Sequence, residues 1–344
     1  MGRDMSGRQR LAWVFVAASA PIVMVFASVP WQWALAAGAV AVIYYYIVYR
    51  LSSAVGGGRT LCALSREAFG GFGRPILAVG AVWTLLAAAD TAVGSAAAFA
   101  GGDEARLSGA VLLALAAYGS IKGTDAIARC VAILAPIVGA LYAVVLLAAL
   151  PQIEWQWCKP WGSAQLLVEY LPVLLLPSAA LFLQSRTEHR RARVLLAAFG
   201  AAPALIAFVT VGCLSPHLAS AEGAPFYTLS KSLRLLSVME RFEPLVCAVL
   251  YLGFFGLLTV LVQAGAAMLW CACTESEHAP GWVGAACCAG IFLMRLARVQ
   301  IPNEVFAIGA TVFWGIFPLL TLLVVAIKIS VKKVKKGVDK GAGL

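Results

Sequence analysis

Long apolar blocks alternate with short polar segments along almost the whole chain. Most blocks approach 20 residues, the length that an α-helix needs to cross about 30 Å of hydrocarbon. A backbone in lipid must satisfy its own hydrogen bonds, so these blocks are predicted to be helices. The ten predicted spans are residues 11–29, 31–49, 75–100, 108–121, 131–150, 165–184, 194–214, 244–273, 282–297 and 305–329. The pattern therefore predicts an all-α polytopic membrane protein.

Composition agrees with lipid as the main solvent. Hydrophobic residues make up 62% of the chain and charged residues 12%, with a mean hydropathy of +0.90. Soluble domains have about 45–50% apolar and about 25% charged residues. These values exclude a soluble enzyme, a disordered chain and a nucleic-acid-binding module. The spans leave no room for a further domain, so we expect one transmembrane domain with halves at 11–150 and 165–329 and a tail at 330–344.

The net charge of +10 is interpreted as a topology signal. If the N-terminus is cytoplasmic, ten spans place 19 of the 26 Lys and Arg residues on the cytoplasmic side. Cytoplasmic loops carry such an excess of basic residues. The loop at 274–280 departs from this pattern, because it holds Glu275 and Glu277 without any Lys or Arg. Both termini are nevertheless predicted to be cytoplasmic.

Two segments outside the spans carry further signals. Residues 226–242 place apolar side chains near helical spacing with basic residues between them, which predicts an amphipathic helix at the outer interface. The basic tail at 328–340 is expected to touch anionic lipid. Nine cysteines are present, six of them in or at the ends of spans, and none has zinc-site spacing. We predict no metal and no cofactor.

Ionisable side chains within spans are the first candidates for function, because they are costly in lipid. Asp90 lies past the middle of the third span, on one helical face with Trp83. It could be a proton, cation or amine site, or a structural hydrogen bond between helices. Glu169 lies near the start of the sixth span. Gln263 is predicted to join helices, and Tyr251 to belong to an interfacial belt or a pocket wall.

Prolines mark the first span of each predicted half. Pro21 removes the hydrogen bond to the Ala17 carbonyl, and Pro172 removes the one to the Val168 carbonyl. Matching interruptions in corresponding spans are the best sequence pointer to a transporter binding site. Simple proline kinks are the alternative interpretation.

Five short motifs follow one another along the chain: residues 6–9, residues 122–129, Glu169 followed by Pro177, residues 225–243 and residues 317–320. Together these motifs resemble the spore germination permeases, the B subunits of germinant receptors within the amino acid–polyamine–organocation superfamily. Two departures from that family lie where a ligand would bind: Ala18-Ser19-Ala20-Pro21 replaces a glycine-rich turn, and Val168 replaces a glycine.

The resemblance implies ten helices in two inverted five-helix repeats of the LeuT type. It also implies a small germinant such as an amino acid, and assembly with A and C subunits in the inner spore membrane. We expect the ligand between spans 1, 3, 6 and 8. The candidate ligand-binding residues are Ala18, Ser19, Pro21, Trp83, Asp90, Glu169, Pro172 and Tyr251.

Two other functions stay open from the sequence. One is a proton-coupled amino acid or amine permease in which Asp90 is the coupling acid. The other is a membrane scaffold that binds no ligand and only assembles partners. No nucleophile–base pair or metal cluster is evident, so we predict no catalytic residue, no enzyme activity and no nucleic-acid partner.

Overall fold

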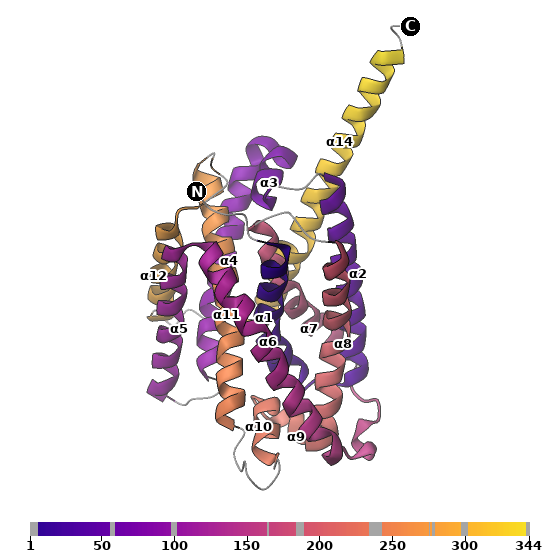
Figure 1. Cartoon of the computed structure of the whole chain (residues 1–344), viewed down its shortest axis with the longest axis vertical. Coiled ribbons are helices and arrows are strands. Elements are labelled where there is room, and N and C mark those ends of the chain that lie inside the picture. Colours follow the sequence, from indigo (N-terminus) through magenta and orange to yellow (C-terminus); the bar gives the residue numbers. More distant parts are fainter. Residues whose placement is uncertain are drawn as a thin grey trace.

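The computed structural model describes residues 6–55, 59–97, 102–163, 165–183, 189–233, 243–274, 276, 279–296 and 302–341. Within these residues the chain is helical and contains no strand. The helices pack into one elongated bundle (Figure 1). Their bounds are α1 Gly7–Phe26, α2 Trp31–Val55, α3 Leu61–Phe69, α4 Gly73–Ala97, α5 Gly102–Lys122, α6 Thr124–Ala149, α7 Gln165–Leu175, α8 His189–Leu214, α9 Pro216–Ala221, α10 Pro225–Ser232, α11 Glu243–Cys273, α12 Gly281–Leu296, α13 Asn303–Ala310 and α14 Phe317–Gly341.

The described part of each predicted span is largely helical, and the all-α class is confirmed for the described residues. The predicted spans 165–184 and 305–329 each comprise more than one helical segment. Six stretches of the described chain are long and apolar enough to cross a membrane: Trp31–Val55, Leu61–Gly94, Thr124–Gln152, Gln165–Phe182, Glu243–Cys273 and Glu304–Lys332. Four shorter apolar helices accompany them: Leu11–Phe26, Leu107–Lys122, Gly200–Leu214 and Gly281–Leu296. The helices begin and end several residues from some predicted bounds. Thus α6 begins at Thr124 because Gly123, with φ +91°, ends the preceding helix.

The outer surface of the bundle is apolar, as lipid contact requires. Ile43, Ile133, Leu147 and Leu293 are each at least 60% exposed. The centre is occupied by α11, which is buried along most of its length and packs on α1 and α4. A helix that is apolar all round is one that lies inside a large or membrane-bound protein.

Close approaches of helices depend on small residues. A Cβ atom at Gly38 of α2 would lie 2.3 Å from the carbonyl oxygen of Gly200 in α8. A Cβ atom at Gly256 of α11 would lie 2.7 Å from Val16 of α1. Small residues allow membrane helices to pack this closely, which maximises dispersion contacts where no hydrophobic driving force acts.

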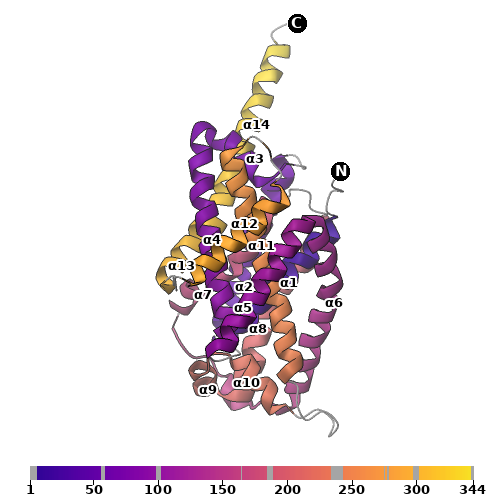
Figure 2. The same ribbon diagram turned by 90° about the vertical axis from the view of Figure 1, so that its left-hand side faces the viewer.

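The connections gather at two ends of the bundle (Figures 1 and 2). At one end, the Trp31 indole donates a hydrogen bond to the Cys158 carbonyl at 2.8 Å, and the Glu154 amide donates one to the Gly212 carbonyl at 2.8 Å. At the other end, the Arg66 guanidinium donates to the Thr274 carbonyl at 3.2 Å. The connections that follow α1, α6 and α8 therefore lie at one end, and the end of α11 lies beside α3 at the other.

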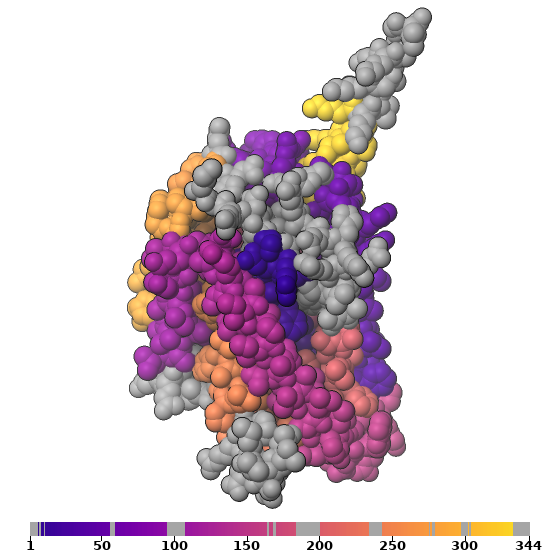
Figure 3. All heavy atoms as spheres, viewed as in Figure 1, coloured from indigo at the N-terminus to yellow at the C-terminus, as the bar shows by residue number. Residues whose placement is uncertain are grey.

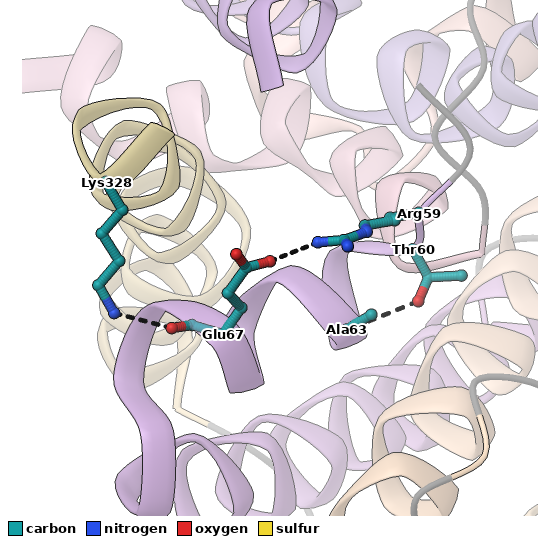
Figure 4. Close-up of polar contacts among 5 residues, drawn as sticks. All are labelled: Arg59, Thr60, Ala63, Glu67 and Lys328. Carbon is teal, nitrogen blue, oxygen red and sulfur yellow. Dashed lines mark hydrogen bonds and ion pairs between the residues drawn. The ribbon is translucent and has the colours of Figure 1, made fainter. Parts of the chain in front are cut away.

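The short helix α3 ties the last helix to this second end (Figure 4). The Thr60 hydroxyl accepts a hydrogen bond from the Ala63 amide and caps the start of α3. The Lys328 ammonium of α14 donates to the carbonyls of Glu67 and Ala68 at 2.8 and 2.9 Å. A cation at the last carbonyls is favourable because the helix dipole is negative there.

Helix irregularities differ from those predicted at the prolines. Helix α1 runs unbroken through Pro21, and α7 continues past Pro172. The change in α7 comes at Leu176–Phe182, which is a 3₁₀ segment with Pro177 near its start. The predicted interruption at Pro172 was therefore one turn too early. An unpredicted π-helical segment, Thr311–Ile316, separates α13 from α14.

Two further predictions concern the segments outside the predicted spans. The predicted amphipathic helix at 226–242 forms from Pro225 to Ser232, with Phe226 and Leu229 buried and Lys231 exposed; its second half, 234–242, lies outside the described residues. The predicted tail is the end of α14, which leaves the bundle as a helix (Figure 2).

Candidate functional site

A cavity of about 220 Å³ lies between α1, α6 and α8. Its lining is almost wholly apolar, and no charged residue takes part among the described residues. The cavity opens sideways between α6 and α8, where Ala143 is exposed and Leu205 is 48% exposed. In the space-filling view, α6 crosses this face of the molecule (Figure 3). The lining residues are Phe15, Ala18, Ser19, Ile22, Val23, Gly139, Tyr142, Ala143, Leu146, Ala202, Leu205 and Ile206.

Two hydroxyl groups are the polar features of this cavity. The Ser19 hydroxyl donates a hydrogen bond to the Val16 carbonyl of its own helix at 2.7 Å, so its oxygen can still accept one. The Tyr142 hydroxyl is buried beside the Ser19 hydroxyl and interacts with it, although the contact falls short of full hydrogen-bond geometry. The Tyr142 ring is held edge-on against Phe226, with centroids 5.9 Å apart. The Tyr142 hydroxyl can therefore donate either to the Ser19 oxygen or to a bound molecule.

The structure brings two of the predicted ligand-binding residues to this cavity. Ala18 and Ser19 line it from α1. Pro21 is buried on the same helix but does not line it. The cavity is bounded by predicted spans 1, 5 and 7, whereas the expected position was between spans 1, 3, 6 and 8. Tyr142, which sequence reasoning missed, carries no signal beyond being a tyrosine within an apolar span.

Trp83 belongs to a separate aromatic cluster. Its ring stacks on Phe313 at 6.2 Å and tilts against Phe306 at 6.3 Å. It also covers Gly309, where a Cβ atom would lie 2.1 Å from the indole. The ring therefore joins α4 to α13 and the π segment, and it does not reach the cavity.

The remaining candidates lie on other helices. Asp90 is partly exposed on α4, two turns beyond Trp83, and Tyr251 is partly exposed on α11. Pro172 is buried in α7. None of the three lines the cavity, and their role in ligand binding stays a prediction. The side chain of Glu169 lies outside the described residues.

A second polar cluster joins the two irregular helix segments. The Tyr44 hydroxyl donates to the Trp314 carbonyl at 2.7 Å, and the Ser178 hydroxyl donates to the same oxygen at 2.5 Å. The Tyr45 hydroxyl donates to the Leu174 carbonyl at 2.8 Å. Side chains of neighbouring helices commonly satisfy backbone groups that an interrupted membrane helix leaves free. Two features of the sequence mark this cluster: the run of tyrosines in the second predicted span, and Pro177.

The predicted structural role of Gln263 is confirmed. Its amide nitrogen donates a hydrogen bond to the Ser120 hydroxyl at 2.7 Å, which joins α11 to α5 in the buried interior. The part of the chain that the structure describes holds no group of three His, Cys, Asp or Glu side chains able to bind a metal. None of the nine cysteines, all of which lie among the described residues, forms a disulfide.

Comparisons with protein-family models and with curated proteins gave no match to this chain.

Proposed function

We propose that the chain is a ten-span, permease-like membrane subunit that senses a small nutrient, as the resemblance to spore germination permeases implies. The observation that carries this proposal is the cavity at Ser19, inside the bundle and midway along α1. A scaffold that only assembles partners needs no such space, whereas a receptor does. Small-molecule sites are concave and mostly apolar, with a few placed polar groups.

The proposed topology of ten spans is supported by the described connections, which lie at opposite ends of the bundle. It counts the four shorter apolar helices as crossings. An even number of crossings leaves both termini on one side, and the basic residues favour the cytoplasm. The proposed membrane is the inner membrane of the spore.

The proposed inverted repeat is supported by helix packing. Helices in corresponding positions of the two halves lie against each other: α2 on α8, α4 on α11, α5 on α12 and α1 on α7. Such pairs meet when two halves are related by an axis in the membrane plane, as in LeuT-type transporters.

In the proposed mechanism, a nutrient favours the conformation that binds it more tightly, and A and C subunits respond to that conformation. A ligand shifts a conformational equilibrium only by its difference in affinity for the two states. Deleting the gene from the spore former that carries it tests this role. We expect spores that no longer respond to at least one nutrient and that respond again when the gene is restored. Unchanged dose responses to a broad nutrient panel would contradict the proposal.

The second candidate is a proton-coupled permease, which the carboxyl group of Asp90 within α4 favours. Uptake into proteoliposomes under an imposed pH gradient separates transport from sensing. Under this candidate, flux depends on the gradient and is lost in Asp90→Asn. A nutrient that binds without flux favours the sensor.

A further inference from the structure

The chemistry of the cavity between α1, α6 and α8 narrows the class of nutrient. None of its described lining residues is charged. A zwitterionic amino acid would bury an ammonium and a carboxylate there without a charged partner. Burying an unpaired charge is far more costly than burying a neutral polar group that finds a hydrogen bond. The lining therefore selects against zwitterions and against ions.

The size of the cavity sets the scale of the ligand. A cavity of roughly 150 Å³ lined by apolar side chains is enough to bind benzene. The 220 Å³ found here has room for a single ring with a short substituent, or for a short aliphatic chain.

The hydroxyl pair fixes the polar end of such a ligand. The buried Tyr142 hydroxyl can donate a hydrogen bond, and the Ser19 oxygen can accept one, because the Ser19 proton is already engaged with Val16. A hydroxyl group on the ligand matches both, since it can accept from Tyr142 and donate to Ser19. Such a hydroxyl would lie between Tyr142 and Ser19 and replace their direct contact with two hydrogen bonds.

The position of the opening points to entry from the lipid. It lies between α6 and α8, and the outward side chains near it are apolar, with Ile137 46% and Leu147 64% exposed. An apolar neutral molecule concentrates in hydrocarbon, whereas a zwitterion does not.

We propose that this cavity binds an uncharged, mainly apolar small molecule that carries one hydroxyl group and hydrogen-bonds to Tyr142 and Ser19. The inference rests on the proposed function, because it names the chemical class that the nutrient receptor takes. The ligand proposed here is an uncharged alcohol, in place of the amino acid that the family resemblance implies.

Binding is tested on the full-length chain in lipid nanodiscs by fluorine NMR, with 4-fluorobenzyl alcohol as the probe. 4-Fluorotoluene lacks the hydroxyl, and 4-fluorophenylalanine presents a similar ring as a zwitterion. We expect a bound resonance for the alcohol, distinct from the lipid-partitioned one. We expect no displacement of it by the zwitterion.

Three substitutions locate the site. Gly139→Leu fills the cavity, and the bound resonance should disappear. Gly290→Leu is the matched control, because the space beside Gly290 is open, and it should leave binding intact. Tyr142→Phe should weaken binding of the alcohol about threefold to tenfold, the range expected for one hydrogen bond, and should leave binding of 4-fluorotoluene unchanged. Ala143→Phe, at the exposed mouth, should also abolish binding and serves if Gly139→Leu fails to fold.

The inference is overturned if wild type gives no bound resonance, if the resonance survives the folded cavity-filled variants, or if Tyr142→Phe weakens both probes equally. Displacement by 4-fluorophenylalanine would also overturn it. The proposed function is tested separately by the germination of spores that lack the gene. The result of that assay does not depend on whether the fluorinated probe binds the cavity.

Discussion

The Ser178 hydroxyl donates a hydrogen bond to the Trp314 carbonyl at 2.5 Å and so joins two irregular helix segments. Ser178 lies in the 3₁₀ segment after α7, and Trp314 lies in the π segment before α14. Tyr44 of α2 donates to the same carbonyl. π segments often occur at functional positions, and here the side chains of two other helices hold one in place.

Removing this support should loosen the π segment. Ser178→Ala and Tyr44→Phe are each expected to lower the free energy of unfolding by about 0.6–1.7 kcal/mol, the range for hydrogen bonds between membrane helices. Hydrogen exchange should quicken at 311–318, because the segment loses its external partners. Ser53→Ala, which removes an exposed hydrogen bond to the Arg50 carbonyl of the same helix, is the control and should change neither quantity. Unchanged exchange in the double variant would contradict the role assigned to Ser178.

The pair Gln263 and Ser120 should show measurable coupling. Gln263→Leu leaves the Ser120 hydroxyl with its bond to the Ala116 carbonyl, and Ser120→Ala leaves the buried Gln263 amide without that acceptor. We therefore expect Ser120→Ala to be the more destabilising change, by about 1–3 kcal/mol. A double-mutant cycle read by denaturant unfolding should give a coupling energy near 1 kcal/mol. Additive effects would show that the contact contributes nothing of its own.

Gly309 packs directly against the Trp83 indole, so the effect of enlarging Gly309 should depend on the size of the side chain at position 83. Gly309→Ala should be destabilising by about 1–3 kcal/mol, because the added methyl group would overlap the indole. In a Trp83→Leu background the same change should be milder, because the smaller side chain leaves room. Thermal unfolding in nanodiscs measures both. Equal effects in the two backgrounds would mean that Trp83 does not set the limit at Gly309.

Much of the fold could be predicted from the sequence, because lipid imposes a strong pattern. The ten apolar blocks coincide with helices, and the hydrogen bond of Gln263 was expected from its cost in an apolar span. The helix interruptions were harder. Pro172 sits in a helix that continues past it, because a membrane helix tolerates the loss of one hydrogen bond when its neighbours pack against it.

The candidate site was predictable only in part. Ala18 and Ser19 line the cavity, but Tyr142 comes from a span without any polar signal. A cavity depends on which helices meet and how closely, and helical periodicity does not encode that. Trp83 and Asp90 are two turns apart on α4, and the Trp83 ring packs on α13 and does not line the cavity.

The proposed topology places two native cysteines on opposite sides of the membrane. Cys158 lies in the connection after α6, and Cys273 ends α11. In variants that keep one cysteine each, a charged maleimide added outside intact cells should label Cys158 and spare Cys273. Labelling of both from one side would contradict ten spans.

The labelling of Cys158 should depend on pH. Burial raises the pKa of its thiol above the ordinary value of 9.0. The thiolate is the reactive form, so its fraction at pH 7 is below that of an ordinary thiol and rises with pH until the raised pKa is passed. The labelling rate should therefore still be rising at pH 9. A rate that levels off well below pH 9 would show that burial does not govern this thiol.

The central claim is that the cavity at Ser19 receives the nutrient. It is tested most directly by measuring thermal unfolding in nanodiscs for wild type, Gly139→Leu and the matched Gly290→Leu across a panel of uncharged and zwitterionic nutrients. A ligand that binds only the folded state raises the midpoint of unfolding. The account predicts that at least one nutrient raises the midpoint of wild type and Gly290→Leu and leaves Gly139→Leu unchanged. A panel that shifts no variant, or that shifts Gly139→Leu as much as wild type, would contradict it.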